Sequence, residues 1–317
     1  MSSNPEVSII IPAKNEELRL GLCLDSIRSL KADQNLYEVI VIDNGSTDRT
    51  VEIARQYGAR VEVVKNVTIA KLRNYGAAMA KGRIFAFVDS DCILSSSWLE
   101  PIFEEFKNNK VGAIGSNYQL KGEGTWVERV SEFQMSETLE RCETNWIQSG
   151  NLVIKREVFD LVSGFDEKLR VCEDSDICYR IKDAGYSILS NKKICSYHLG
   201  FPVTLGQFIR KEFWYGSDIL NLCVKHSKSG RYLGVLSVTA YYLLSIVVLM
   251  AGILLRNFIV VIVAGVLVVA ASFLLAVKNS FEKKDYRYVL QLTLFYFLFG
   301  LARSASLMRS KIWLNNC

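Results

Sequence analysis

The sequence lacks the cysteine and histidine patterns that mark metal-bound or disulfide-bonded small domains. It has eight cysteines and two histidines, with no CxxC pair and no cluster of His and Cys at zinc-ligand spacing. These absences exclude a zinc finger and give no sign of a disulfide framework. We therefore expect the cysteines to be reduced, small apolar residues inside a cytosolic domain.

We also expect no signal peptide. The first residues, MSSNPEVSIIIP, have no basic region, and their apolar run is only as long as a strand. We therefore expect the first two hundred residues to stay on the cytosolic side of the membrane, where they are made.

The first two thirds of the chain have no net positive charge. The net charge of the 317 residues is +5, but residues 1–206 carry −4, residues 207–232 carry +3 and residues 233–317 carry +6. A mildly acidic globular part argues against a nucleic-acid partner. The basic excess lies beside apolar segments, as expected for a chain that faces anionic membrane lipids.

Charge is absent altogether from two long stretches, Leu233–Leu255 and Phe258–Val277. Each could cross a hydrocarbon core of roughly 30 Å at about 1.5 Å per residue. The alternative is a buried helical hairpin in a soluble core, which their apolarity on all sides disfavours. We predict two membrane spans, about 233–255 and 258–277.

A third apolar segment, Tyr288–Leu307, is interrupted by Arg303. If it crossed the membrane fully, Arg309 and Lys311 would lie outside, against the preference of basic residues for the cytosolic side. We expect this segment to be tilted, re-entrant or interfacial, with Arg303 facing protein or lipid headgroups.

Strand-like and helix-like patterns alternate through the first two hundred residues. This alternation predicts an α/β fold with a mostly parallel, Rossmann-like sheet covered by helices on both faces. In such sheets ligands bind at the carboxyl ends of the strands. The expected strands are 7–11, 37–43, 61–64 and 84–88, and the expected helices are 16–30 (with Leu18, Leu22 and Ile27 on one face), 48–57 and 69–80.

Polar residues follow three of these strands, at positions 12–16, 43–46 and 89–91. Asp89 and Asp91 are separated by one residue, so on a continuing strand both would point the same way. Two close carboxylates need a cation or hydrogen-bond donors. The simpler alternative is that Asp91 caps a helix opened by Ser95–Trp98. Convergence of the three polar segments on one crevice favours a binding site.

Two further segments stand out beyond residue 112. CEDSDICYR (172–180) places Glu173, Asp174 and Asp176 at the start of a helix, where capping alone needs one acid, so we infer a site. The segment 204–222 carries Leu205, Phe208 and other apolar residues on one face, which predicts an interfacial helix on the membrane. A helix packed on the globule is the alternative.

An ordered set of motifs in residues 7–200 resembles the family-2 inverting glycosyltransferases with the GT-A fold, anchored in the membrane at the C-terminus. The motifs are IIIPAKNE, VIDNGSTDRT, IAKLRNYGAAMAKGRIFAFVDSD, SGNLVIKREVFDLVSGFDE and the EDSD that follows. The resemblance implies a GT-A catalytic domain at 1–203, an amphipathic interfacial helix and linker at 204–232, and a membrane region at 233–317 with its third segment at about 288–307. The protein would be a multi-pass protein of the cytoplasmic membrane, with the catalytic domain in the cytosol.

The resemblance also implies a donor of the nucleoside-diphosphate sugar type, carrying UDP or GDP. Asp91, with Asp89 and Ser90 beside it, would hold a divalent cation, Mg²⁺ or Mn²⁺, on the diphosphate. His198 would be a further metal ligand, with a purely structural histidine as the alternative. The residues that the resemblance places around the nucleotide sugar are Pro12, Ala13, Asn15, Glu16, Asp43, Lys71, Arg73, Asn74, Asp89, Ser90 and Asp91.

For the acceptor side, the resemblance makes Asp174 the base that takes the proton of the acceptor hydroxyl. Glu173, Trp146, Gly150 and Asn151 would form the acceptor and sugar subsite.

Two features of the sequence differ from the family pattern and bear on the reaction that we predict. Ala13 stands where many relatives carry an aromatic residue that stacks on the base, so we expect other residues to bind the base. The interfacial segment lacks the QxxRW pattern of processive synthases, and two or three spans are too few for a polymer channel. We therefore predict transfer of one sugar to a lipid-linked or membrane-proximal glycan. The alternatives are a polyprenyl-phosphate glycosyltransferase and an inactive nucleotide-binding membrane scaffold.

Overall fold

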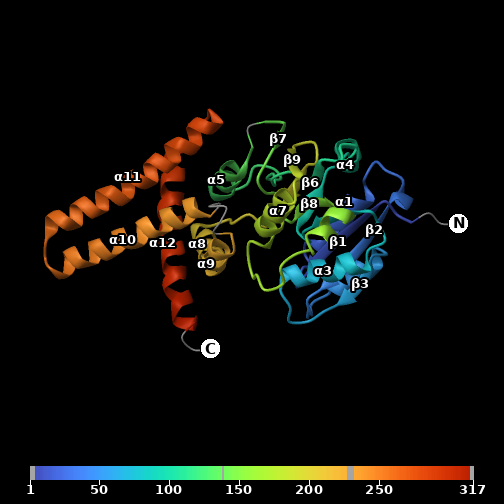
Figure 1. Ribbon diagram of the computed structural model, residues 1–317, viewed down its shortest axis with the longest axis horizontal. Coiled ribbons are helices and arrows are strands. Elements are labelled where there is room, and N and C mark those ends of the chain that lie inside the picture. Colours follow the sequence, from blue (N-terminus) through green and yellow to red (C-terminus); the bar gives the residue numbers. More distant parts are fainter. Residues whose placement is uncertain (1–3, 138, 227–231, 315–317) are drawn as a thin grey trace. The chain divides into compact units, whose positions relative to one another are not determined.

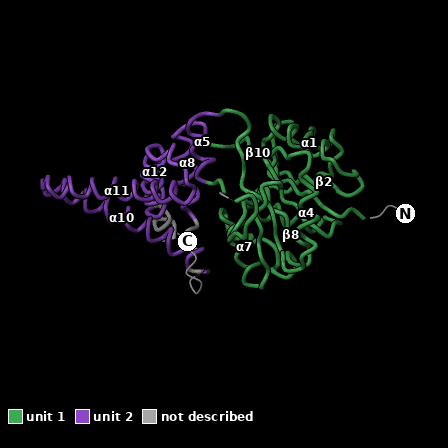
Figure 2. The backbone as a smooth tube through the Cα atoms, turned by 90° about the horizontal axis from the view of Figure 1, so that it is seen from above, with its two compact units in different colours: residues 1–123, 135–201 green, residues 124–134, 202–317 purple. Residues whose placement is uncertain are grey.

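The computed structural model describes residues 4–137, 139–226 and 232–314 (Figure 1). The chain divides into two compact units (Figure 2). Residues 1–123 and 135–201 form what we call the sheet unit, and residues 124–134 and 202–317 form the helical unit. The sequence did not predict that 124–134 leaves the first unit, and the domain boundaries drawn from it remain a prediction.

An eight-stranded sheet in the order β3-β2-β1-β4-β8-β6-β9-β7 forms the centre of the sheet unit. Strands β3, β2, β1 and β4 are parallel, and so are β6 and β9, whereas β8 is antiparallel to both of its neighbours. This confirms the α/β fold with a mostly parallel sheet. The strands are β1 Val7–Ala13, β2 Tyr37–Asp43, β3 Arg60–Val63, β4 Ile84–Val88, β6 Val111–Gly115, β7 Arg141–Glu143, β8 Asn151–Lys155 and β9 Ser187–Asn191, with β5 Cys92–Leu94 and β10 Ser196–His198 in a second, antiparallel sheet.

Helices cover both faces of the large sheet because successive side chains of its strands point to opposite sides. Along β1, Ile9 and Ile11 pack in the core that includes α1, whereas Ile10 packs in the core that includes α3. The helices are α1 Leu20–Arg28, α2 Thr50–Gln56, α3 Ile69–Met79, α4 Leu99–Phe106, α6 Arg156–Leu161 and α7 Glu173–Asp183, with a short 3₁₀ helix at Gln34–Leu36.

The predicted apolar face of the first helix is wrong. Helix α1 begins at Leu20, not Glu16, and the side chains of Leu18 and Leu22 are 84% and 48% exposed. The residues before Leu20 form a loop whose backbone is hydrogen-bonded elsewhere, so the helical register starts later. Its buried residues, at the spacing i, i+3, i+4, i+7, are Leu20, Cys23, Leu24 and Ile27.

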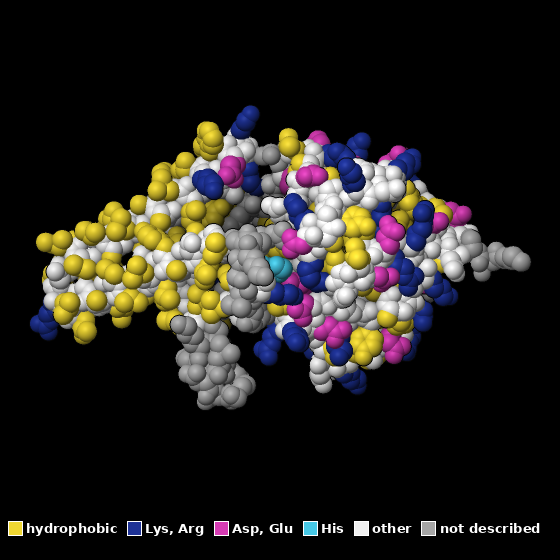
Figure 3. Space-filling model, viewed as in Figure 1, with side chains coloured by type: hydrophobic (Ala, Val, Ile, Leu, Met, Phe, Trp, Pro, Cys, Tyr) yellow, Lys and Arg dark blue, Asp and Glu magenta, His cyan; other side chains and the backbone are white. Residues whose placement is uncertain are grey.

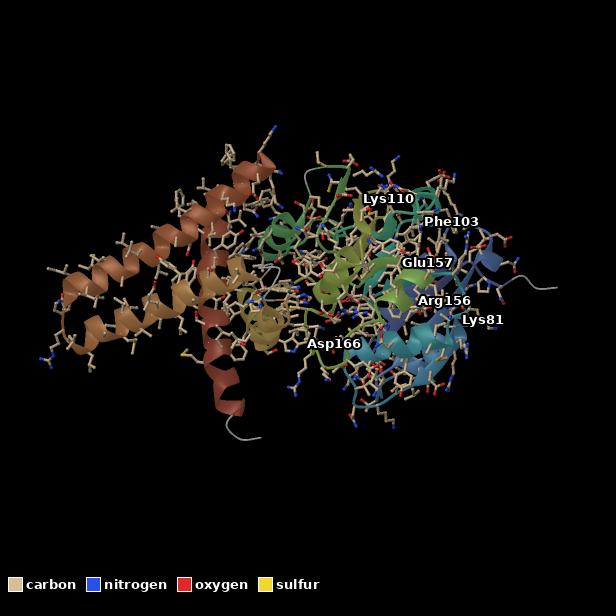
Figure 4. The ribbon with its side chains drawn as sticks, viewed as in Figure 1. Lys81, Phe103, Lys110, Arg156, Glu157 and Asp166 are labelled. Carbon is tan, nitrogen blue, oxygen red and sulfur yellow. The ribbon has the colours of Figure 1, made fainter. Side chains whose placement is uncertain are left out.

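Helix α6 follows β8 directly and is fixed to the start of β4. Arg156, its first residue, donates hydrogen bonds to the carbonyl oxygens of Gly82 at 3.2 Å and Ala80 at 3.0 Å (Figure 4). The loop after α6, which contains Asp166, leads to α7.

The helical unit contains α5 Trp126–Met135 except its last residue, α8 Leu205–Tyr215, a 3₁₀ turn at Gly216–Asp218, α9 Ile219–Lys225, α10 Leu233–Leu254, α11 Phe258–Lys283 and α12 Val289–Leu314. By length and composition, α10, α11 and residues 289–308 of α12 could each cross a membrane. Helix α11 extends six residues beyond the predicted end at Val277, into the charged segment that follows it. Figure 3 shows hydrophobic side chains over the surface of the long helices, whereas charged side chains are interspersed over the sheet unit.

Candidate active site

Two loops at the carboxyl ends of β1 and β2 are tied together. The side-chain oxygen of Asn15 accepts from the amide of Thr47 at 2.9 Å, and the amide of Asn15 donates to Ser46 Oγ at 2.8 Å. The Asn15 backbone has φ 55°, a left-handed conformation that asparagine tolerates. The amide of Glu16 donates to Thr50 Oγ1 at 2.7 Å. These bonds hold the first loop in place and explain why α1 starts late.

Asp43, at the end of β2, is 1% exposed and organises its own loop. Its Oδ1 accepts hydrogen bonds from the amides of Gly45 and Ser46, each at 2.9 Å, and its Oδ2 accepts from the Ser46 hydroxyl. The structure thus places Asp43 beneath the loop that follows β2. A direct bond to a base or ribose remains a prediction.

A pocket of about 260 Å³ opens at this edge of the sheet. Six of its lining residues were predicted to bind the nucleotide sugar, and four others were not selected. Burial raises the pKa of the Glu16 carboxyl; Arg19 partly offsets this, and Asp91 adds to it. The pocket is lined by the predicted residues Pro12, Ala13, Glu16, Asp89, Ser90 and Asp91, and by Lys14, Asn44, Ile69 and Leu72.

Asp89 and Asp91 lie in a turn, so the predicted strand alternation does not apply to them. Strand β4 ends at Val88, and the amide of Cys92 donates to the carbonyl of Asp89 at 3.0 Å. The capping alternative for Asp91 is also wrong, because α4 begins at Leu99 and its N-cap residue makes no side-chain cap bond. The turn gives the two carboxylates different partners.

Asp89 belongs to a buried charge network centred on Arg73. Arg73, on α3, is 1% exposed; one terminal nitrogen donates to Asp89 Oδ1 and the other to Glu173 Oε1, both at 2.7 Å. Tyr118 donates to the second oxygen of Asp89 at 3.1 Å, and Ser149 donates to Glu173 Oε1 at 3.2 Å. Arg73 therefore joins the end of β4 to the first turn of α7. The sequence did not indicate this structural role, and the contact of Arg73 with the nucleotide sugar remains a prediction.

Asp91 has one nitrogen-bearing side chain near each of its oxygens. Arg19 Nη1 lies 3.2 Å from Oδ2, and His198 Nε2 lies 3.4 Å from Oδ1. The antiparallel pairing of β5 with β10 sets His198 opposite Cys92, next to Asp91. The His198 ring also stacks on Tyr118, with centroids 4.4 Å apart.

Sequence reasoning missed Arg19 and Tyr118. Neither occurs in a motif that we could recognise, and each lies far along the chain from the aspartate it contacts. Only the fold brings them to the site.

The side chains around Asp91 include groups that can bind a divalent cation. Ligand atoms of Asp91, Cys92 and His198 lie within 4.8 Å of one another. Burial, with the charges of Asp89 and Asp91, raises the pKa of the Cys92 thiol well above its ordinary value, which disfavours a thiolate ligand. A carboxylate and an imidazole remain; the carboxylate suits Mg²⁺ or Mn²⁺, and a pair without a thiolate does not favour a soft metal. Asp89 is less available, because both of its oxygens already accept hydrogen bonds.

The three acids at the start of α7 have separate environments. Burial and the adjacent Glu173 charge raise the pKa of Asp174 to about 7, although the Ser175 amide donates to it at 2.7 Å. Asp176 is fully buried and forms an ion pair with Arg180 at 2.7 Å, within the same helix. Asp174 is thus the acid whose pKa suits it to proton transfer near neutral pH.

Other predicted residues have partners away from the pocket. Lys71 Nζ lies 3.5 Å from Glu167 Oε2. Asn74 donates to the carbonyl of Phe165 at 2.9 Å and accepts from its amide at 3.0 Å, which holds the loop before α7. The structure gives these two residues a role in fixing that loop, and any donor contact remains a prediction.

Asn151 and Trp146, predicted for the acceptor subsite, differ in exposure. Asn151 is fully buried; it accepts from Trp98 Nε1 at 2.9 Å and donates to the carbonyl of Ile194 at 2.8 Å. These bonds assign Asn151 to the framework under the site, not to a sugar contact. Trp146, in contrast, is 38% exposed and available to a ligand.

Gly150, just before β8, packs so closely against Asp89 and Tyr118 that a larger side chain does not fit there. A Cβ there would lie 2.3 Å from Asp89 Oδ2 and 2.1 Å from Tyr118 Oη. We expect Gly150→Ala to lower the free energy of unfolding by about 1–3 kcal/mol, because an overpacked site must shift. Thermal or urea unfolding in detergent measures this.

Gly21→Ala is the matched control for this variant. Its Cβ would meet nothing closer than Tyr57 Oη at 3.8 Å, on a helix that favours alanine. Unchanged stability of Gly150→Ala would contradict the crowding described above.

Comparison with known proteins identifies the family. Residues 8–165 match Glycosyl transferase family 2. Glycosyltransferase AglE of Haloferax volcanii is 31% identical over 226 residues, which cover 68% of this chain and 73% of that protein. The chain belongs to glycosyltransferase family 2. It is therefore a glycosyltransferase, with a GT-A-like domain followed by three long apolar helices.

Solved structures agree on the fold of this family-2 chain. The mannosyltransferase PcManGT of Pyrobaculum calidifontis, in complex with GDP-Man and Mn²⁺, matches with a TM-score of 0.61 at 17% identity, over 95% of this chain and 87% of that one. TarS 1–349 of S. aureus, in complex with UDP-GlcNAc, matches with a TM-score of 0.50 at 19% identity, over 68% and 67% of the two chains.

Proposed function

We propose that this glycosyltransferase transfers one sugar, with inversion, from a nucleoside-diphosphate sugar to a hydroxyl of a lipid-linked or membrane-proximal glycan. The observation that carries the proposal is the buried Arg73. It holds Asp89 beside the donor pocket and Glu173 beside Asp174, both at 2.7 Å. One guanidinium thus connects the residues proposed for the donor with those proposed for the acceptor. The UDP and GDP donors of the neighbours named above support this donor class.

On the donor side, the pocket between the loops after β1, β2 and β4 has room for part of a nucleotide. Asp91 and His198 would hold a divalent cation there. When bound, the cation supplies positive charge to the diphosphate leaving group. Lys14 and Arg19, which lie at or beside the pocket, add positive charge from the chain itself.

Binding of Mn²⁺ alone tests the metal assignment without any turnover. We expect Asp91→Asn to abolish the binding. We expect Arg19→Gln to tighten it by up to about fivefold, because it removes a partly exposed competing cation worth about 1 kcal/mol or less. Electron paramagnetic resonance of free Mn²⁺ measures both effects. Unaltered affinity in Asp91→Asn would place the metal elsewhere.

On the acceptor side, Asp174 would remove the proton of the attacking hydroxyl. Its raised pKa of about 7 makes it a stronger base than an ordinary aspartate, while leaving it largely ionised just above neutrality. Trp146 and Glu173 would border the acceptor.

The pH dependence of kcat follows from this pKa. Protonated Asp174 cannot accept a proton, so kcat should fall about tenfold per unit as the pH drops below about 7, and level off above it. An aspartate with its ordinary pKa would hold activity constant down to about pH 4. A rate independent of pH between 5 and 8, in enzyme shown to stay folded, would exclude this base.

The direct test of the function is a transfer assay. Membranes containing the full chain are incubated with a panel of labelled nucleotide sugars, with Mn²⁺ or with a chelator, and the anomeric configuration of the product is determined. We expect transfer from one UDP- or GDP-sugar with inverted configuration. Nucleotide binding with neither hydrolysis nor transfer would instead support an inactive scaffold.

The proposal also includes the subcellular location of the protein. The apolar helices anchor the protein in the cytoplasmic membrane, and the sheet unit faces the cytosol, where nucleotide sugars are made. The basic residues near those helices would contact anionic membrane lipids.

A further inference from the structure

Helix α12 could span a membrane by its length, but it packs against the C-terminal part of α11 and the first half of α10 without extending along the rest of the hairpin. Figure 1 shows α10 and α11 side by side as a hairpin, with α12 running across them, and in Figure 2 the hairpin again extends away from α12. A three-helix transmembrane bundle would instead have nearly parallel axes.

The contacts of α12 lie at one end of the hairpin. A Cβ on Gly300 would lie 2.3 Å from the Tyr242 ring, and Ser304 Oγ donates to the carbonyl of Thr239 at 3.4 Å. Leu292 and Phe295 share a core with Ala276 of α11. These partners lie in the first half of α10 and toward the end of α11. The far end of the hairpin is exposed instead: Leu254 is 82%, Phe258 77% and Ile259 75% exposed.

Helix α8 and the turn after it run beside α12 in the same direction. Phe208 packs on Phe295 with ring centroids 4.2 Å apart, and Glu212 accepts from Arg303 at 2.8 Å. One turn further, a Cβ on Gly216 would lie 2.7 Å from Ser306 Cβ. Contacts that advance along both helices mean that α8 and α12 share one orientation to the bilayer. If α8 lies in the plane of the bilayer, α12 therefore lies in that plane too.

The Glu212–Arg303 ion pair distinguishes the two orientations. The side chains are 14% and 11% exposed, and the Arg303 guanidinium lies over the rings of Phe299 at 5.1 Å and Tyr215 at 5.6 Å. An ionised pair in the centre of a bilayer is costly, whereas at the headgroup boundary it is readily accommodated. Aromatic rings around the pair are also typical of that boundary.

We propose that α8 and α12 lie together in the plane of one membrane interface, and that only the α10–α11 hairpin crosses the bilayer. The inference rests on the membrane association included in the proposed function. The partner of this helix pair is the lipid surface itself, continuous with the apolar surface of the hairpin. Exposed apolar side chains available to the lipid are Ile209, Trp214, Leu290, Leu294 and Met308.

This arrangement has a definite topological consequence. The sheet unit and the end of α12 lie on the same side of the membrane, and the turn at Arg256-Asn257 lies on the other. A third crossing by α12 would put its end on the side of that turn.

Glycosylation mapping of the full chain in microsomes tests the consequence. The sheet unit already carries two acceptor sequons, Asn44-Gly45-Ser46 and Asn66-Val67-Thr68, which report on its own side. One added sequon, in a flexible Gly/Ser extension, is inserted between Arg256 and Asn257, and in a second variant an identical extension follows Cys317. Mobility shifts reversed by a deglycosidase count the modified sites.

We expect modification of the inserted turn and none of the native sequons or of the C-terminal extension. Modification of the C-terminal extension would overturn the in-plane placement of α12. Lack of modification at the turn would overturn the crossing by the hairpin. None of these results depends on turnover. The proposed topology can therefore be refuted while the proposed glycosyl transfer stands, and glycosyl transfer can be refuted while the topology stands.

Discussion

Asp174→Asn is expected to lower kcat by about 10²–10⁴, the range typical for loss of a general base. The amide keeps the shape of the side chain and its place at the start of α7, but it cannot take a proton from the acceptor hydroxyl. Affinity for the nucleoside diphosphate should not change, because the pocket lined by Glu16 and Asp91 is left intact. Steady-state kinetics with the donor found in the transfer assay, together with calorimetric binding of its nucleoside diphosphate, measure both quantities.

Asp160→Asn serves as the control for this variant. Asp160 is an exposed acid of the sheet unit whose nearest cation, Arg156, is 4.0 Å away. Its replacement should leave kcat unchanged. If Asp174→Asn retains full turnover with a phosphate acceptor, the polyprenyl-phosphate alternative gains support, since an ionised phosphate needs no base. Full turnover with a hydroxyl acceptor would refute the role given to Asp174.

Arg73→Met is expected to have the largest effect on stability, lowering the free energy of unfolding by about 3–5 kcal/mol. Methionine fills much of the space but leaves Asp89 and Glu173 without the guanidinium that both contact at 2.7 Å. Glu173 is only 6% exposed, so water cannot fully replace the lost bond. Chemical unfolding of the full chain in detergent, followed by circular dichroism, measures the loss.

Two further variants make this prediction specific. Arg83→Met removes an arginine that is 74% exposed and pairs with Glu6 at the surface, and it should cost about 1 kcal/mol or less. Adding Asp89→Asn and Glu173→Gln to Arg73→Met should recover part of the stability, because no unpaired charge is then buried. Stability of Arg73→Met within about 1 kcal/mol of the wild type would mean that the network is not a stabilising element.

The sequence by itself determined the layers of the sheet unit and the chemistry at the ends of its strands. Alternation of buried strands with helices predicted β1, β2 and β4 closely, and the polar residues that follow them predicted a crevice at their carboxyl ends. Local periodicity and turn chemistry suffice there, because they act over a few residues. The long apolar stretches were likewise visible, since length and composition alone define them.

Only the tertiary structure decided the partners of each site residue. Arg73 meets Glu173 one hundred positions along the chain, and Arg19 meets Asp91 seventy-two positions along it. It also separated Asn151, buried in the framework, from Trp146, which is open to a ligand. It set α12 across the hairpin and paired Arg303 with Glu212. These contacts form between residues that are far apart in the sequence, because the fold brings their side chains within hydrogen-bonding distance. A local sequence pattern extends over only a few residues and therefore cannot predict them.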